Sequence, residues 1–342
     1  MSIWETISNA YQSYANYFWR EITLQNEGGL SHNYFWMLIL VSVFFFGLEI
    51  WKPWRKNQPK FRKDFWLDFF YMFFNFFLFS LIIYNATSAV VVEFVNGVIE
   101  KVSGFNLAAN NPLQYWPYWA IMLAGFVVRD FVQWWTHRLL HRSNKLWEFH
   151  KVHHSVEQMG FAAHLRYHWM ETIVYRSIEY LPLALMGIGL HDFFLIHIFT
   201  LAWGHYNHAN IQVSGRITGS VVGLFLGVLV VLSYPDFTVA NKVLTITAGL
   251  LTGLFVLGPF MRKIFNSPEM HIWHHAKDLP ANRPFGINFG ITLAVWDYIF
   301  KTAEIPHDGK DIVLGFDNLK DFPDDFVEQA TYGFTAQKHP KA

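Results

Sequence analysis

The fold and the chemistry of the chain are both predicted from residues Asp130–His154, DFVQWWTHRLLHRSNKLWEFHKVHH. The stretch holds five histidines: His137, His141, His150, His153 and His154. Because helical residues three and four apart share a face, each of its two histidine segments presents imidazoles toward one point. A second segment far downstream, His271-Ile-Trp-His274-His275, repeats the HxxHH spacing.

These eight histidines predict a site for two metal ions. Neutral imidazole binds Zn, Cu, Fe and Ni, whereas a single tetrahedral ion takes only four ligands. A lone histidine on an apolar helix is usually a packed core residue. Three boxes, two of them with identical spacing, are not typical of that arrangement. We therefore expect the boxes, with one or two histidines from between them, to meet around a pair of ions.

The composition indicates a membrane protein. Of the 342 residues, 53% are hydrophobic and only 15% are charged, whereas about 25% are charged in typical soluble domains. The formal net charge is zero, which does not favour nucleic-acid binding. The chain has no cysteine, and this excludes disulfides, thiolate zinc sites and cysteine-ligated iron–sulfur clusters.

The apolar segments predict an all-α, polytopic membrane bundle with a histidine-rich cytoplasmic cap that holds the two metals. A membrane helix needs about 20 apolar residues. The expected spans are Tyr34–Ile50, Phe65–Val92, Tyr115–Val128, Thr172–Leu190, Phe193–Trp203, Ile217–Leu232 and Val243–Met261. In the last two spans, Gly219, Gly223, Gly227, Gly249 and Gly253 have the spacing that lets membrane helices approach closely. The alternative is that these glycines are merely tolerated in apolar helices.

The orientation is predicted from the basic segment Trp51–Lys63, which contains no acidic residue. By the positive-inside rule this segment is cytoplasmic, and the span count then places every histidine box on the cytoplasmic face. The first residues lack a signal peptide. Together with the basic loop this favours a multi-pass protein of the bacterial inner membrane, with the endoplasmic reticulum as the alternative.

The histidine boxes and their surroundings resemble the fatty acid hydroxylase/sterol desaturase superfamily of membrane di-iron oxygenases. The matching stretches are His137-Arg-Leu-Leu-His141, His150-Lys-Val-His153-His154, Arg166-Tyr-His168-Trp-Met-Glu171, His208-Ala-Asn210, Ser267-Pro-Glu-Met-His271-Ile-Trp-His274-His275, Asn288-Phe-Gly290, Trp296-Asp297 and Phe300-Lys-Thr302. They cover roughly Asp130–Thr302, and three boxes in this order are specific to the superfamily but not to a subgroup within it.

The resemblance implies two iron ions, held almost wholly by histidine, that activate O2 for attack on an unactivated lipid C–H bond. It also implies a separate electron donor, of the ferredoxin or cytochrome b5 type with its reductase. The chain has neither a GxGxxG loop nor cluster-binding cysteines, which agrees with that implication. Imidazole accepts both iron and zinc, so zinc can replace iron in recombinant protein.

The ligands that the resemblance implies come from the three boxes and the HxN element. They are His137, His141, His150, His153, His154, His208, His271, His274 and His275. His205 lies one turn before His208 and is a further candidate. No catalytic residue is assigned beyond the metal ligands. Arg166 and His168 are expected to support ligands, and Asp130, Asn288 and Asp297 are either similar supports or ordinary caps.

The predicted organisation has three parts: an N-terminal membrane region (1–128), a catalytic region with two membrane hairpins (129–302) and a cytoplasmic tail (303–342). One departure from the family pattern is the long insertion Ile211–Met270 between the HxN element and the last box. We hypothesise that its apolar hairpin walls a lipid-access channel or forms an oligomer contact.

The function predicted from the sequence is O2-dependent hydroxylation or desaturation of a membrane lipid, whether sterol, fatty-acyl lipid, ether lipid or carotenoid. One alternative is a zinc-dependent lipid hydrolase, in which the metal polarises water. The other is a histidine-rich metal transporter or sensor. A transporter places ionisable residues near the middle of the membrane, and the predicted spans are nearly free of them.

Overall fold

The computed structural model describes residues 3–26, 29–78, 97–98, 100–102, 104, 112–185 and 190–335. These residues form helices and loops, and their nearest approach to a sheet is two isolated antiparallel bridges, Phe265–Leu293 and Ala276–Leu314. The prediction of an all-α fold is therefore confirmed. The second half of the predicted span Phe65–Val92 lies outside the described residues.

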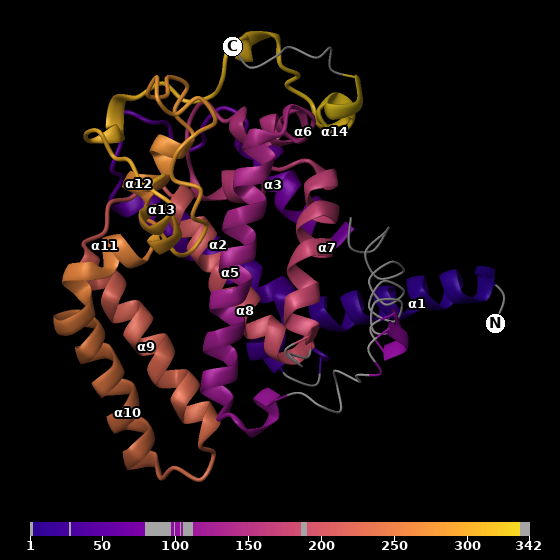
Figure 1. The fold of residues 1–342 in the computed structure, drawn as a ribbon, viewed down its shortest axis with the longest axis vertical. Coiled ribbons are helices and arrows are strands. Elements are labelled where there is room, and N and C mark those ends of the chain that lie inside the picture. Colours follow the sequence, from indigo (N-terminus) through magenta and orange to yellow (C-terminus); the bar gives the residue numbers. More distant parts are fainter. Residues whose placement is uncertain are drawn as a thin grey trace.

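The helices follow one another along the chain in the order that Figure 1 colours. They are α1 (Ile3–Ile22), α2 (Tyr34–Trp51), α3 (Phe65–Phe73), α5 (Tyr118–Arg142), α6 (Asn144–His154), α7 (Trp169–Leu185), α8 (Leu190–His208), α9 (Gly215–Ser233), α10 (Val239–Thr252), α11 (Met261–Ile264), α12 (Pro268–His274), α13 (Val295–Ile299) and α14 (Phe326–Thr335). Short 3-10 or π turns are η1 (Gly29–His32), η2 (Phe74–Leu78), η4 (Pro112–Tyr115), η5 (Phe161–Leu165), η6 (Gly253–Leu257), η7 (Gly258–Phe260), η8 (Gly309–Asp311) and η9 (Leu319–Asp321).

Among the described residues, three helices are long and apolar enough to cross a membrane. They are Tyr34–Trp51, Gly215–Ser233 and a continuous helical rod, Val239–Ile264, that joins α10 to α11. Most of their residues are not buried within the chain, so apolar side chains face outward, as a surrounding lipid phase requires. The described segments α5, α7 and α8 carry polar side chains along their length and are not among these candidates.

The α9–α10 hairpin is packed through its glycines. A Cβ atom at Gly223 would collide with the backbone carbonyl of Gly249, and one at Gly253 would collide with that of Gly219. Only residues without side chains allow the two backbones to approach this closely. The hairpin lies at the end of the molecule opposite the C-terminal loops (Figure 1).

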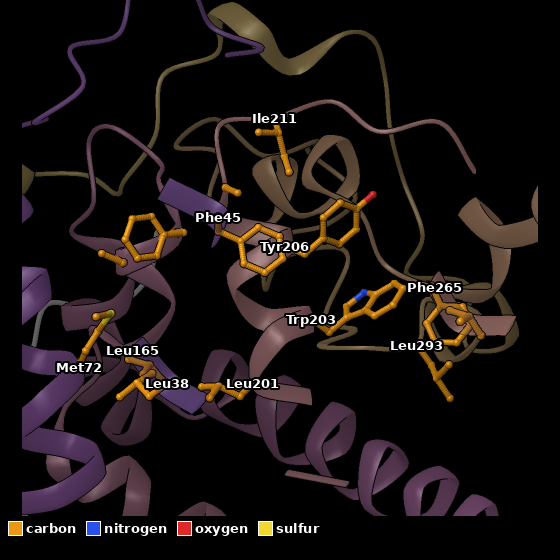
Figure 2. Packing of buried hydrophobic residues seen from close by; sticks show 14 of the residues in the cluster. Leu38, Phe45, Met72, Leu165, Leu201, Trp203, Tyr206, Ile211, Phe265 and Leu293 are labelled. Carbon is orange, nitrogen blue, oxygen red and sulfur yellow. The ribbon is translucent and has the colours of Figure 1, made fainter. Parts of the chain in front are cut away.

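The main apolar core joins α2 and α8 to the segments around the histidines. Figure 2 shows Leu38 and Phe45 of α2 beside Leu201 and Tyr206 of α8, while Trp203 extends toward Phe265 and Leu293. All of these side chains are buried. The core therefore holds α8, and with it the HxN element, against the chain that precedes the last histidine box.

The basic loop after α2 lies at the same end of the molecule as the histidine segments. Trp54 N donates to Asn210 O at 2.9 Å, and Arg55 Nη2 donates to Met159 O at 2.9 Å. Arg62 is buried and paired with Asp68 at 2.6 Å. The loop is therefore anchored to the histidine-bearing end of the fold.

The C-terminal segment packs back over the same end. Gly315 N donates to His275 O at 3.0 Å, and Lys277 N donates to Val313 O at 2.9 Å. Helix α14 lies against α6. Its Ala330 O also accepts a hydrogen bond from His168 Nε2, just before α7, at 2.7 Å. The division of the chain at residues 128 and 302 stays a prediction.

Candidate metal centre

Nine buried histidines meet in two groups at the end of the bundle. The first group is His137, His141, His150, His154 and His274, and the second is His153, His208, His271 and His275. Within each group the candidate ligand atoms all lie within 4.8 Å of one another. These are the nine residues to which the family resemblance points, and they converge from α5, α6, α8 and α12.

Each HxxHH box divides between the two groups. Helix α6 contributes His150 and His154 to the first group and His153 to the second. Helix α12 contributes His274 to the first group, while its His271 and the C-cap residue His275 belong to the second. The reason is helical geometry, because residues four apart differ by about 40° and residues three apart by about 60° in the opposite sense. One box can therefore face two ions at once.

The start of each box helix is set by a serine cap. Ser143 accepts a hydrogen bond from Leu146 N before α6, and Ser267 accepts one from Met270 N before α12. Pro268 occupies the first turn of α12, where its missing N–H costs nothing. These local signals determine where each helix begins and hence which face its histidines occupy.

In both groups the Nε2 atoms of the imidazoles face one another. Neighbouring Nε2 atoms are 3.1–3.3 Å apart. Nitrogen ligands about 2.0–2.1 Å from a common ion lie about 3.0–3.4 Å from each other, so this spacing is that of imidazoles around a metal. Two nitrogen lone pairs would not otherwise be pointed at each other in a buried site.

Four of the outer Nδ1 atoms are held by backbone carbonyls. His137 donates to Phe289 O at 2.8 Å, His274 to Ile287 O at 2.8 Å, His153 to Arg166 O at 3.0 Å, and His208 to Gly204 O at 2.8 Å. A carbonyl only accepts, so each Nδ1 carries the proton and each Nε2 presents a lone pair. Such outer contacts orient metal-binding histidines.

Glu171 supports a candidate ligand. It belongs to the Arg166–Glu171 stretch of the family resemblance, but no role was predicted for it from the sequence. Its carboxylate lies 2.7 Å from His150 Nδ1, and burial raises the pKa of Glu171 to about 7. The contact forms because α7 begins beside α6, with Glu171 in its first turn. The signal that could have identified it is a carboxylate next to His168 in the Arg166–Glu171 element.

The surroundings keep the imidazoles neutral. Burial, reinforced by neighbouring imidazoles, lowers the pKa of His154, His271 and His275 well below its usual range. For His153 the same causes lower the pKa to about 4. A protonated histidine cannot bind a metal, so this environment favours the ligand form at neutral pH.

The backbone behind the first group is organised by two buried aspartates. Asp297 accepts from Phe289 N at 2.9 Å and from Gly290 N at 2.7 Å, which positions the carbonyl that binds His137. Asp130 accepts from Thr292 N at 3.1 Å on the same segment. Both aspartates act on the loop rather than on a ligand side chain.

His205 lies in neither histidine group. Its Nδ1 is 2.9 Å from His164 Nδ1, and its Nε2 is 3.2 Å from Ser42 Oγ of α2. Its place on α8 is one turn from His208, as the spacing predicted, but its ring faces α2. His168 also points away from the groups, toward α14, while Arg166 contributes its backbone carbonyl.

The donor set fits borderline metal ions. All candidate ligands are neutral, buried nitrogens with lone pairs directed inward, and imidazole suits iron and zinc alike. The cluster could therefore hold metal, and that it holds two ions stays a prediction.

Comparison with known proteins identifies relatives of this region. The family model described as fatty acid hydroxylase matches residues 122–224, which begin in α5 and end in α9. The ornithine lipid hydroxylase OlsE of Rhizobium tropici is 26% identical over 191 residues, covering 56% of this chain and 44% of that protein. The alkylglycerol monooxygenase of Homo sapiens is 26% identical over 202 residues, covering 58% of this chain and 33% of that protein.

These alignments span less than half the length of either relative. No solved structure matches the chain. The residues matched by the family model contain the first two histidine boxes and the HxN element and end before the last box. This part of the chain is therefore similar to fatty acid hydroxylases.

Proposed function

We propose that the protein is an O2-dependent lipid hydroxylase of the membrane that binds two iron ions in its two histidine groups. The observation that carries the proposal is the convergence of nine Nε2 atoms in two sets, with Nδ1 atoms held from outside. The relatives support the reaction class, since both are named for oxygenation of a lipid.

The five-histidine group and the four-histidine group would each hold one ion. Iron bound there would supply activation of O2 for insertion of one oxygen atom into a lipid C–H bond. In balance, the C–H bond becomes C–OH, the second oxygen atom becomes water, and a separate donor supplies two electrons with two protons. The chain itself orients the imidazoles and excludes bulk water by burying all nine of them.

The inserted hairpin supports a route for the lipid tail. An apolar cavity of about 270 Å³ lies between α5, α8 and α9, with Phe126, Phe199, Phe225 and Leu229 among its lining residues. A cavity lined almost wholly by apolar side chains suits a hydrocarbon chain. We therefore favour the access-channel hypothesis for residues 211–270 over the oligomer contact.

The site is proposed to face the cytoplasm of a bacterial cell. Lys52, Lys56 and Lys60 are exposed on the loop that is anchored beside the histidine segments. Cationic residues next to a membrane span favour the cytoplasmic side. The same face would receive an electron donor of the ferredoxin or cytochrome b5 type.

The test is comparative lipidomics of cells with and without the gene, grown in air and without oxygen. We expect lipids that are heavier by one oxygen atom, about 16 Da, only when both the gene and oxygen are present. A lipid product formed equally without oxygen would instead support the zinc hydrolase. Metal analysis of the purified full chain should find about two iron or zinc ions per molecule.

A further inference from the structure

A second cavity, separate from the apolar one, lies directly against the histidine groups. It has a volume of about 130 Å³, and its wall includes His137 and His150 of the first group and His153, His208 and His271 of the second. Most of the other residues of this wall come from α5, α7 and α8, and the rest are His164, Leu165, Tyr167 and Ile291. This cavity gives a molecule that is oxidised at the two groups a place for its reacting carbon beside the imidazoles.

Three helices direct polar side chains into this cavity at helical spacing. On α5, Arg129 and Gln133 lie two turns and one turn before His137. On α7, Glu179 lies two turns after Glu171, and on α8, Thr200 lies two turns before His208. Residues at this spacing share one face, so each polar stripe ends at the candidate metal centre.

The far end of the cavity is closed by a buried ion pair. Arg129 Nη2 lies 3.4 Å from Glu179 Oε2, and Arg129 Nη1 donates to Thr200 Oγ1 at 2.6 Å. His197 Nδ1 is 3.2 Å from the same guanidinium. The cavity is therefore bounded by metal-facing imidazoles at one end and by opposite charges at the other.

Three residues of the cavity wall each contain a buried oxygen that has no hydrogen-bond partner among the described residues. These oxygens are Gln133 Oε1, Thr172 Oγ1 and Asn207 Oδ1. These residues are at least nine-tenths buried, with exposed fractions of 8%, 7% and 1%. The Asn207 amide is oriented because its Nδ2 donates to Ile291 O, which leaves Oδ1 as an acceptor. Unpaired buried acceptors of this kind call for a donor on a ligand.

We infer that this cavity binds the polar head group of the lipid substrate, through N–H or O–H donors that pair with Gln133, Thr172 and Asn207. The inference rests on the proposed lipid hydroxylase and specifies its substrate class. A lipid held in this way places a carbon of the head group, or one next to it, against the histidines. The protein then oxidises lipids that have amide or hydroxyl head groups, at a carbon in or near the head group. It discriminates against lipids whose head group has no hydrogen-bond donor.

The test measures binding of two tritium-labelled probes to the full-length protein in nanodiscs. N-palmitoylethanolamine carries an amide N–H and a hydroxyl, whereas ethyl palmitate has the same acyl chain and no donor. We expect the first probe to bind about tenfold more tightly, as satisfying buried acceptors implies. Gln133→Met and Thr172→Val should each reduce this preference to within about threefold, while binding of the ester is retained.

The matched control is Thr136→Val. Thr136 Oγ1 is also buried without a partner, but Thr136 is not part of the cavity wall. This variant should keep the full preference. Retained binding of ethyl palmitate shows that each cavity variant is folded. If Gln133→Met does not fold, Thr172→Val still tests the inference, because valine has the same shape as threonine.

Equal binding of the two probes by the natural sequence, as for a merely water-filled cavity, would overturn the inference. Unchanged preference in both cavity variants would also overturn it. Binding requires no turnover, so these outcomes are separate from those of the lipid analysis. If lipids are hydroxylated but the protein binds both probes equally, only the inference about the head group fails. If the protein prefers the amide probe but no lipid is hydroxylated, only the proposed activity fails.

Discussion

The two histidine groups are built from the same HxxHH spacing but are held differently. In the first group, His137 and His274 donate to backbone carbonyls and His150 donates to Glu171. In the second, His153 and His208 also donate to backbone carbonyls. His275 Nδ1, however, has no hydrogen-bond partner among the described residues, and His271 Nδ1 has only a 3.4 Å contact with Asn266. Equal sequence spacing therefore does not produce equal support.

The difference suggests a division of roles. The first group has five imidazoles and a carboxylate behind one of them, so it should bind its ion more tightly. The second has four imidazoles, three of which face the polar cavity. We expect the second group to be the more labile site and the one closer to substrate.

Removing a first-group ligand should have the largest effect. His274→Ala deletes an imidazole whose Nε2 lies 3.2 Å from that of His141 and 3.1 Å from that of His154. We expect loss of at least one metal ion per chain and a fall in hydroxylation of about 100-fold or more. The measurements are elemental analysis of the purified protein and product yield.

The control for that variant is His205→Gln, because His205 lies outside both groups. It should keep the full metal content. If metal were lost equally in both variants, His205 would be a ligand after all, and the boundary between the two groups would have to be redrawn.

Glu171→Gln should weaken the first group selectively. The amide keeps the volume of the side chain but removes the negative charge that accepts from His150 Nδ1. Loss of such an outer partner typically lowers metal affinity about 10- to 100-fold. Metal titration monitored by a competing chelator would measure the change. Glu157→Gln, on an exposed ion pair with Lys63, is the matched control and should leave affinity unchanged.

Chelation of the natural protein should remove the metal in two phases. The second group lacks a partner for His275 Nδ1, so we expect its ion to leave about tenfold faster. Metal release would be followed in stopped-flow experiments with a coloured chelator. A single phase that accounts for all of the metal would contradict the proposed asymmetry.

Asp297→Asn should have the smallest effect. The carboxylate accepts from two backbone N–H groups, Trp134 Nε1 and Thr302 Oγ1, and an amide can satisfy fewer of these donors. We expect a loss of about 1–3 kcal/mol in the free energy of unfolding. Metal affinity should fall only a few-fold, because His137 keeps its carbonyl acceptor. Thermal unfolding and metal titration would separate the two effects.

Several features of the site were predictable because they depend on residues near one another in the chain. The spacing of His150 and His153, like that of His271 and His274, indicates shared helical faces once each segment is helical. The glycines at 219, 223, 249 and 253 indicate close helix packing, which the hairpin uses. The family resemblance supplied His208, which no local pattern joins to the boxes.

Other features could not be predicted because they depend on contacts between distant segments. The sequence placed His205 beside His208, but the ring's orientation toward Ser42 is decided by the packing of α8 against α2. Glu171 reaches His150 because α7 starts next to α6. The cavity beside the histidine groups likewise forms only where α5, α7 and α8 meet the histidine-bearing segments.

By itself, then, the amino-acid sequence indicated the nine histidines that could bind a metal, the helical spacing that presents them and the three apolar segments long enough to cross a membrane. These properties follow from side-chain chemistry and helical periodicity, which are local. Only the tertiary structure decided how nine imidazoles divide into a group of five and a group of four, and which of them have a partner behind the ring. That division depends on the distances between α5, α6, α8 and α12, and such distances are set by packing of the whole chain.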